Sequence, residues 1–277
     1  MRKSIAIIIT SILVLSGCNK QQSVSDRLLN EVEKAIAINP DSASNLLKSI
    51  SSPEKLDDKA FARWCMLSGK ITDEIFNSIL PTYQLERAYD WYSSHGSPDE
   101  QVQILIYLGR SYFADGDYDK AMSIYTNALD IAGKNKLNNL IGYTYDYIGD
   151  LYREKFMRTE AIKRYEIAAE YFKKEKNTDS YACALRDIGR EYAQMDSLSH
   201  ALNILIIADS VAANTSNINV TASINNALGN IYSMQNKYDK AEEYLLKALL
   251  TGREKMPDYV ALIDLYTCLL YTSPSPR

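Results

Sequence analysis

Apolar residues recur along most of the chain at helical spacing, and the pattern returns after 40 residues. In one copy Leu108 and Tyr112 lie four residues apart, and in the next Ile148 and Tyr152 do the same. Residues four apart share one face of an α-helix, so each copy predicts a first helix with an apolar stripe. Polar turn residues follow, and a second helix rich in alanine completes the copy. No segment shows the alternation of a β-strand.

Glycine, tyrosine and alanine each form a series that keeps this interval. The series are Gly69, Gly109, Gly149, Gly189 and Gly229, then Tyr112, Tyr152, Tyr192 and Tyr232, then Ala128, Ala168, Ala208 and Ala248. Small residues at matching points allow two antiparallel helices to approach to the short end of the roughly 8–10 Å packing range. We therefore expect the glycines to act through packing. Self-similarity at a fixed interval predicts a solenoid.

The order of these residues resembles a known repeat. Leu-Gly-x-x-Tyr, then Ala, three residues, Tyr or Leu, two residues and Ala is similar to the tetratricopeptide repeat. The resemblance implies an all-α fold, an α-solenoid of antiparallel helix pairs in a right-handed superhelix. The chain departs from the family because its copies exceed the usual ~34 residues. Gly133, Lys173, Ala213 and Arg253 also stand where proline is usual, so the superhelical pitch cannot be transferred.

The resemblance also implies a groove, lined by the first helices, that holds a protein or peptide segment. The polar residues it places there are Arg110, Asp146, Asp150, Arg186, Arg190, Asn226 and Asn230. Arg186 and Arg190, one turn apart, offer bidentate donors to a carboxylate or to peptide carbonyls. We expect an extended, acidic peptide against them. The alternative is that Arg186 pairs with Asp146 or Asp150 and the row is an ordinary polar helix face.

Helix-breaking residues divide the chain into segments. Residues 26–52 predict a capping helical hairpin, interrupted at Asn39-Pro40, with Asp41 or Ser42 capping its second helix. Residues 53–97 form a degenerate repeat, with helices expected over 56–70 and 82–94. Four regular repeats occupy 98–257, and 258–267 begins a further one. Residues 19–25 form a polar tether.

The first 18 residues have the composition of a secretory signal. Arg2 and Lys3 precede an apolar run over 5–15 that is too short for a membrane span. Leu15-Ser16-Gly17-Cys18 resembles the bacterial lipobox, which implies cleavage before Cys18 and attachment of lipid to its thiol. An ordinary secreted signal is the alternative. Because no acidic run follows Cys18, we expect a lipid-anchored, periplasm-facing protein of the bacterial cell envelope.

The last ten residues do not continue the pattern. Residues 268–277, CLLYTSPSPR, resemble the translation of an adaptor used in transposase-based DNA sequencing libraries. A glycine is due one interval after Gly229, but position 269 is Leu269. We therefore expect these residues to be foreign, with a genuine tail as the alternative.

Composition narrows the function further. The formal net charge is −4 and no basic cluster is present, which argues against a nucleic-acid partner. Cys65 and Cys183 lie almost three repeats apart, too far for a disulfide in a stack of helices, and each is expected to be a small buried residue.

No catalytic, cofactor-binding or metal-binding set is expected. Asp115, Asp117 and Asp119 mimic a calcium loop but lack its glycine and closing acidic ligand, so they are interpreted as helix caps. Neighbouring side chains point apart on a turn, which argues against a triad of Asp196, Ser199 and His200, and we expect a linker between helices there. His95 before Gly96 is typical of a helix C-terminus.

These features favour a non-enzymatic interaction module. The signal, the Pro40–Ala43 hairpin sequence and the 40-residue repeats are similar to the sensor halves of envelope-spanning regulators of Gram-negative bacteria. A scaffold lipoprotein for envelope assembly is the alternative. A glycan-binding outer-membrane lipoprotein is disfavoured, because such proteins have less regular repeats.

Overall fold

The computed structural model of the protein describes residues 25–75, 79–252 and 256–272. In these ranges every regular element is a helix and no strand occurs, so the all-α prediction is confirmed. The first helix spans 25–36. The others are α2 (Pro40–Lys48), the 3₁₀ turn η1 (Pro53–Lys55), α3 (Asp58–Ile75), α4 (Thr82–His95), α5 (Pro98–Ala114), α6 (Tyr118–Asn135), α7 (Asn138–Glu154), α8 (Arg158–Lys174), α9 (Thr178–Gln194), α10 (Leu198–Ala212), α11 (Ile218–Met234), α12 (Tyr238–Thr251) and α13 (Met256–Thr272).

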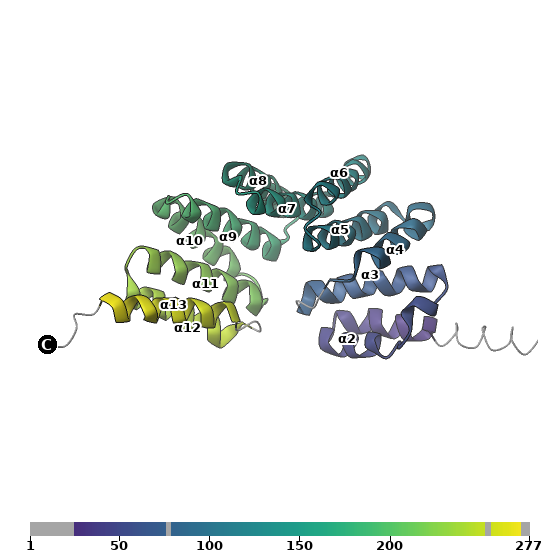
Figure 1. The fold of residues 1–277 in the computed structure, drawn as a ribbon, viewed down its shortest axis with the longest axis horizontal. Helices are drawn as coiled ribbons and strands as arrows, with labels where there is room; N and C mark the ends of the chain where they lie inside the picture. Colours follow the sequence, from purple (N-terminus) through teal and green to yellow (C-terminus); the bar gives the residue numbers. More distant parts are fainter. Residues whose placement is uncertain (1–24, 76–78, 253–255, 273–277) are drawn as a thin grey trace, which may run out of the picture. The chain divides into compact units, whose positions relative to one another are not determined.

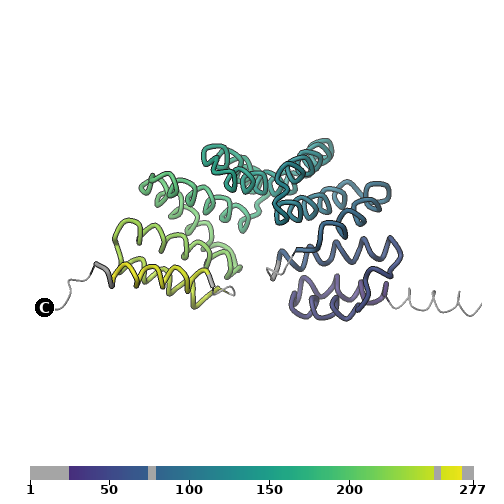
Figure 2. The backbone as a smooth tube through the Cα atoms, viewed as in Figure 1, coloured from purple at the N-terminus to yellow at the C-terminus, as the bar shows by residue number. Residues whose placement is uncertain are grey.

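The helices gather in two compact units, Met1–Ile131 and Ala132–Arg277, and their boundary lies within α6 (Figure 1). In the first unit α3 packs on α4, and α4 on α5. In the second unit α7 pairs with α8, α9 with α10 and α11 with α12 (Figure 2). α9 also contacts α11, and α11 contacts α13, so these first helices of successive repeats are neighbours within this unit.

The repeat glycines lie where two helices of one pair approach most closely. A Cβ built on Gly149 would lie 2.5 Å from Tyr165 Cε1, and one built on Gly229 would lie 2.6 Å from Leu245 Cγ. Tyr165 and Leu245 are themselves fully buried. Gly69 differs, because its built Cβ would meet Tyr107 of α5 and not a residue of its own pair. The alanines at 128, 168, 208 and 248 are fully buried.

The same tight turn joins the two helices of each regular repeat. Its key residue has a left-handed backbone at Gly116 and, one interval later each time, at Phe156, Asp196 and Asn236. The next residue donates its N–H to the carbonyl of the repeat tyrosine, as in the 2.9 Å bond from Met157 N to the oxygen of Tyr152. This six-to-one bond is a Schellman turn, which satisfies an otherwise unpaired helix carbonyl.

The first unit corrects two local predictions and confirms a third. Asn39 caps α2, because its side chain accepts from Ser42 N at 3.0 Å and Pro40 occupies the first helical position; Asp41 and Ser42 therefore lie inside the helix. α3 begins at Asp58, two residues later than expected, and continues to Ile75. The predicted helix C-terminus at His95 is confirmed, because α4 ends there and Gly96 caps it in an extended conformation (φ −82°), donating its N–H to the carbonyl of Tyr92.

Several other predictions concern local chemistry. Asp117 acts as a cap, since its Oδ1 accepts from Lys120 N at 3.3 Å. Asp196 lies in a turn, but His200 lies in α10 and stacks on Tyr192, so the expected linker covers only part of this trio. Cys65 and Cys183 are free thiols as predicted; Cys65 is buried, and Cys183 is only partly buried.

The signal sequence, Cys18 and nearly all of the tether lie outside the described residues. α13 covers 258–267 and continues across the first positions of the adaptor-like segment. The predicted limits of the segments, the lipid anchor and the foreign origin of 268–277 stay predictions. Within the part of the chain that the structure describes, no helix combines the length and apolarity needed to cross a bilayer.

Candidate protein-binding face

Six of the seven predicted groove residues lie on the first helices of the second unit. They are Asp146 and Asp150 on α7, Arg186 and Arg190 on α9, and Asn226 and Asn230 on α11. Each helix contributes two residues one turn apart, which fall on one side of it. We call this side of α7, α9 and α11 the first-helix face. The seventh residue, Arg110, lies on α5 in the first unit, where it pairs with Asp73 of α3 and lies over the Tyr107 ring.

Arg186 is held on this face by Asp187, its neighbour on α9. Its Nε donates to Asp187 Oδ1 at 3.0 Å and its Nη2 to Oδ2 at 2.6 Å. Its Nη1 donates to Ser223 Oγ of α11 at 2.9 Å. The bidentate donors that we predicted for a ligand are therefore used within the chain, and the partner is neither Asp146 nor Asp150.

Asp187 is 5% exposed, and its charge is stabilised by cations. Burial raises the pKa of its carboxyl, but Arg186, Arg190 and Arg153 together outweigh burial and hold the pKa below its ordinary value. Arg186 shows the complementary shift, because Asp187 overcomes the effect of burial and raises the pKa of the guanidinium. The two residues form a buried ion pair that is ionised at neutral pH.

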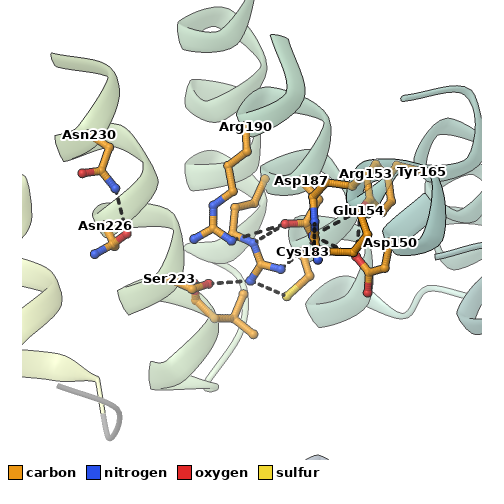
Figure 3. Close-up of polar contacts among 12 residues, drawn as sticks. Asp150, Arg153, Glu154, Tyr165, Cys183, Asp187, Arg190, Ser223, Asn226 and Asn230 are labelled. Carbon is orange, nitrogen blue, oxygen red and sulfur yellow. Dashed lines mark hydrogen bonds and ion pairs between the residues drawn. The ribbon is translucent and has the colours of Figure 1, made fainter. Parts of the chain in front are cut away.

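A second ion pair lies within α7 and receives a hydrogen bond from Tyr165 of α8. Arg153 Nη1 lies 2.8 Å from Asp150 Oδ1, and the Tyr165 hydroxyl donates to the same oxygen at 2.7 Å (Figure 3). Burial raises the pKa of Asp150 in spite of Arg153, and Asp187 raises it further. Tyr165 is the buried residue beneath Gly149, so this pair fixes the polar end of a core side chain.

Asp146 differs from its neighbours because its Oδ1 is buried without a hydrogen-bond partner in the described residues. The residue as a whole is partly exposed. Burial, followed by the charges of Asp150 and Asp187, raises the pKa of this carboxyl well above its ordinary value.

Arg190 and the two asparagines form the more open part of the face. The Arg190 side chain is 41% exposed, and its closest ion-pair contact is a long one, 3.4 Å from Nη1 to Asp187 Oδ1. Desolvation and the charge of Arg186 lower its pKa to about 10, so it remains a cation at neutral pH. Asn226 is buried and donates to Asp258 of α13 at 2.8 Å, whereas Asn230 is exposed and donates to Asn226 at 3.1 Å.

Sequence reasoning missed Asp187 and the buried pair of Glu191 with Arg158, whose atoms lie 2.9 Å apart. Neither acid stands at a repeated position: Tyr147 and Ala227 occupy the positions 40 residues from Asp187. The available signal was the alternation of charge in Arg186-Asp187-Ile188-Gly189-Arg190-Glu191, which is unusual for a helix that contacts neighbours on both sides. The face offers hydrogen bonds and charge, and the described residues show no nucleophile–base arrangement on it.

Comparison with known proteins agrees with the repeat pattern. Two models of the tetratricopeptide repeat match residues 105–138 and 221–256. The photosystem I assembly protein Ycf3 of Rippkaea orientalis is 32% identical over 91 residues, which cover 32% of this chain and 52% of that protein. The chain therefore spans about half the length of this curated relative.

Solved structures share the fold at low sequence identity. A Rap protein complexed with Competence and Sporulation Factor matches with a TM-score of 0.74 and 18% identity, over 88% of this chain and 69% of that one. The apo quorum sensor NprR from B. thuringiensis matches with a TM-score of 0.56 and 15% identity, over 91% and 73%. The chain carries tetratricopeptide repeats and has the α-solenoid fold of tetratricopeptide-repeat proteins.

Proposed function

We propose that the chain is a non-enzymatic protein-binding module that holds an extended segment of its partner on the first-helix face. The proposal rests on one observation: some polar side chains of this face are bonded within the chain, and others are exposed. Arg186, Asp187 and Asn226 are bonded to other helices or to each other, whereas Arg190 and Asn230 keep exposed donors beside them. A fixed polar platform with free donors at its rim suits the backbone of an extended chain.

The relatives support a role in protein recognition. One similar structure was solved with Competence and Sporulation Factor bound, and the curated relative is named as an assembly protein. At these identities the likeness extends to the fold alone, and the chain's own residues determine which partner the face can bind.

We further propose that the module is anchored in the bacterial envelope by lipid on Cys18 and faces the periplasm, as the interaction half of a signalling regulator. The support is the sequence before Cys18 and the regular repeats. A scaffold for envelope assembly would use the same face. Labelling with a radioactive fatty acid tests the anchor: the Cys18→Ala protein should incorporate no label and leave the membrane fraction.

Arg190 provides the test of the face. Arg190→Gln should weaken partner binding by about 1.5–3 kcal/mol if its hydrogen bond is charge-assisted and sheltered. Lys247→Gln is the matched control, because Lys247 is an exposed cation on α12 that pairs with Glu243 on its own helix; its effect should stay below ~1 kcal/mol.

The measurement is affinity for a partner isolated from envelope extract, with helicity checked by circular dichroism. Arg190→Gln should keep the fold, since Arg186 still holds Asp187. Equal affinities of the two variants for the partner would place recognition on another surface.

A further inference from the structure

The first-helix face contains one more acid than its internal cations satisfy. Asp150 has Arg153, Asp187 has Arg186, and Glu191 has Arg158. Asp146 forms no ion pair within the described residues, and its buried Oδ1 accepts no hydrogen bond. A carboxylate oxygen removed from water without a partner costs free energy, so this group is incomplete in the unbound chain.

The nearby cation cannot complete it without breaking another pair. Arg186 already directs Nε and Nη2 to Asp187, and its Nη1 donates to Ser223 and Cys183. Moving this guanidinium to Asp146 would remove the bidentate partner of the more deeply buried Asp187 and leave it only the long contact to Arg190, which is unfavourable. The residue Asp146 is partly exposed, so its carboxyl lies next to the surface that a bound partner would cover.

We propose that Asp146 receives a cationic side chain of the bound protein, an arginine guanidinium or a lysine ammonium. This inference rests on the proposed function and specifies the partner at the same face. It replaces the acidic peptide expected from the sequence, because the charge left over inside the face is negative near α7. A partner with a basic residue at Asp146 and backbone carbonyls or an acidic group near Arg190 would meet complementary charges along the face.

The site should respond to pH because the cation requires the ionised carboxylate. The charged groups around Asp146 are Asp150 and Arg153 on its own helix and Asp187 and Arg186 on α9. The two acids and burial favour the protonated form, and the two arginines oppose them. Binding of a cation therefore releases a proton from Asp146, and affinity should rise with pH until the free carboxyl is ionised.

The experiment uses the full chain with ¹³C-labelled aspartate and two small probes. N-acetyl-arginine methylamide is the cation, and N-acetyl-citrulline methylamide is its uncharged isostere. Carboxyl NMR of Asp146, assigned with Asp146→Asn, follows titration by each probe. The arginine probe should shift this resonance and lower the apparent pKa of Asp146. The citrulline probe should have an affinity lower by at least about tenfold. Glu170→Gln, an exposed acid-to-amide change on α8, should leave these shifts unchanged.

Equal shifts with both probes would overturn the proposal, since a protonated Asp146 that donates to a carbonyl would not distinguish them. No shift of this resonance up to the solubility limit of the arginine probe would overturn it as well. The two proposals can be told apart. A protein partner that depends on Arg190 but binds the Asp146→Asn chain normally would support the binding face and refute the cation site. Thermal unfolding of each variant confirms that it is folded.

Discussion

Asp146 and Asp187 show how neighbouring acids on one face acquire opposite properties. Asp187 is the more buried, yet its pKa is held below the ordinary value because the bidentate Arg186 and two further arginines compensate its burial. Asp146 is next to the same network but receives no hydrogen bond at Oδ1, so burial and the neighbouring acids raise its pKa. Partner geometry, more than burial, decides which acid is ionised.

The raised pKa of Asp146 should be visible in the pH dependence of the free energy of unfolding. A carboxyl whose pKa is raised in the folded state loses stability as pH rises above its unfolded pKa of about 3.9. Asp146→Asn removes this loss, so the variant should be more stable than the wild type at pH near 7, by about 1–3 kcal/mol. The advantage should vanish below about pH 4, where the acid is protonated in both states. Urea unfolding at both pH values measures it; a variant less stable at neutral pH would show that the carboxylate is satisfied.

Phe156 has an unexpected backbone conformation. Its backbone is left-handed (φ 58°), and the residue is 79% exposed, so the side chain gains little burial in return. Gly116 occupies the equivalent position one repeat earlier without this cost. Phe156→Gly should stabilise the chain by about 1 kcal/mol. Its thermal unfolding should be compared with Asn236→Gly, where the gain should be smaller because asparagine tolerates this conformation.

At the scale of helices, the repeat glycine allows close packing of two helices but has a low intrinsic helix propensity. Glycine in a helix interior costs roughly 1 kcal/mol relative to alanine. The chain retains it at Gly149 because a Cβ there would lie 2.5 Å from Tyr165, whose hydroxyl is held by Asp150. Tyr165 cannot move away without breaking that bond.

A pair of glycine substitutions separates the two effects. Gly149→Ala should destabilise the chain by about 1–3 kcal/mol through overpacking. Gly133→Ala is the control, because Gly133 is exposed near the end of α6 and a Cβ there meets nothing within 4 Å. It should stabilise the chain by up to about 1 kcal/mol. Denaturant unfolding measures both, and changes of the same sign would contradict the packing role of Gly149.

The helices could be predicted from the sequence because one interface recurs. The 40-residue interval of glycine, tyrosine and alanine places the same contact in each pair, and local exceptions arise where capping residues compete, as at Asn39. The ion pairs of the first-helix face could not be predicted in the same way. Arg186 lies on the first helix of its repeat, but it pairs with the adjacent Asp187, which belongs to no repeated series. Pairing among charges depends on which side chains reach one another in space, and periodicity carries no information about that.

At the scale of the second unit, stability should be distributed along the row of helices. α7 contacts α8, α8 contacts α9, and the series continues to α13 through neighbours. In such an arrangement a defect weakens its own interface and the next one, and its effect declines with distance along the row. The ion pairs of the first-helix face extend this coupling, because Arg186 of α9 also bonds Ser223 of α11.

Hydrogen exchange on two glycine variants at opposite ends of the unit tests this distribution. Gly149→Ala disturbs α7 and α8, and Gly229→Ala disturbs α11 and α12, where the new Cβ would meet Leu245. Each should lose amide protection mainly in its own pair and less in the adjoining one, because local opening needs only the interfaces around it. Mass spectrometry of peptides from α7 to α12 gives the two profiles. Identical profiles across all six helices would mean that the unit opens as one cooperative block and that the repeat interfaces are not separable.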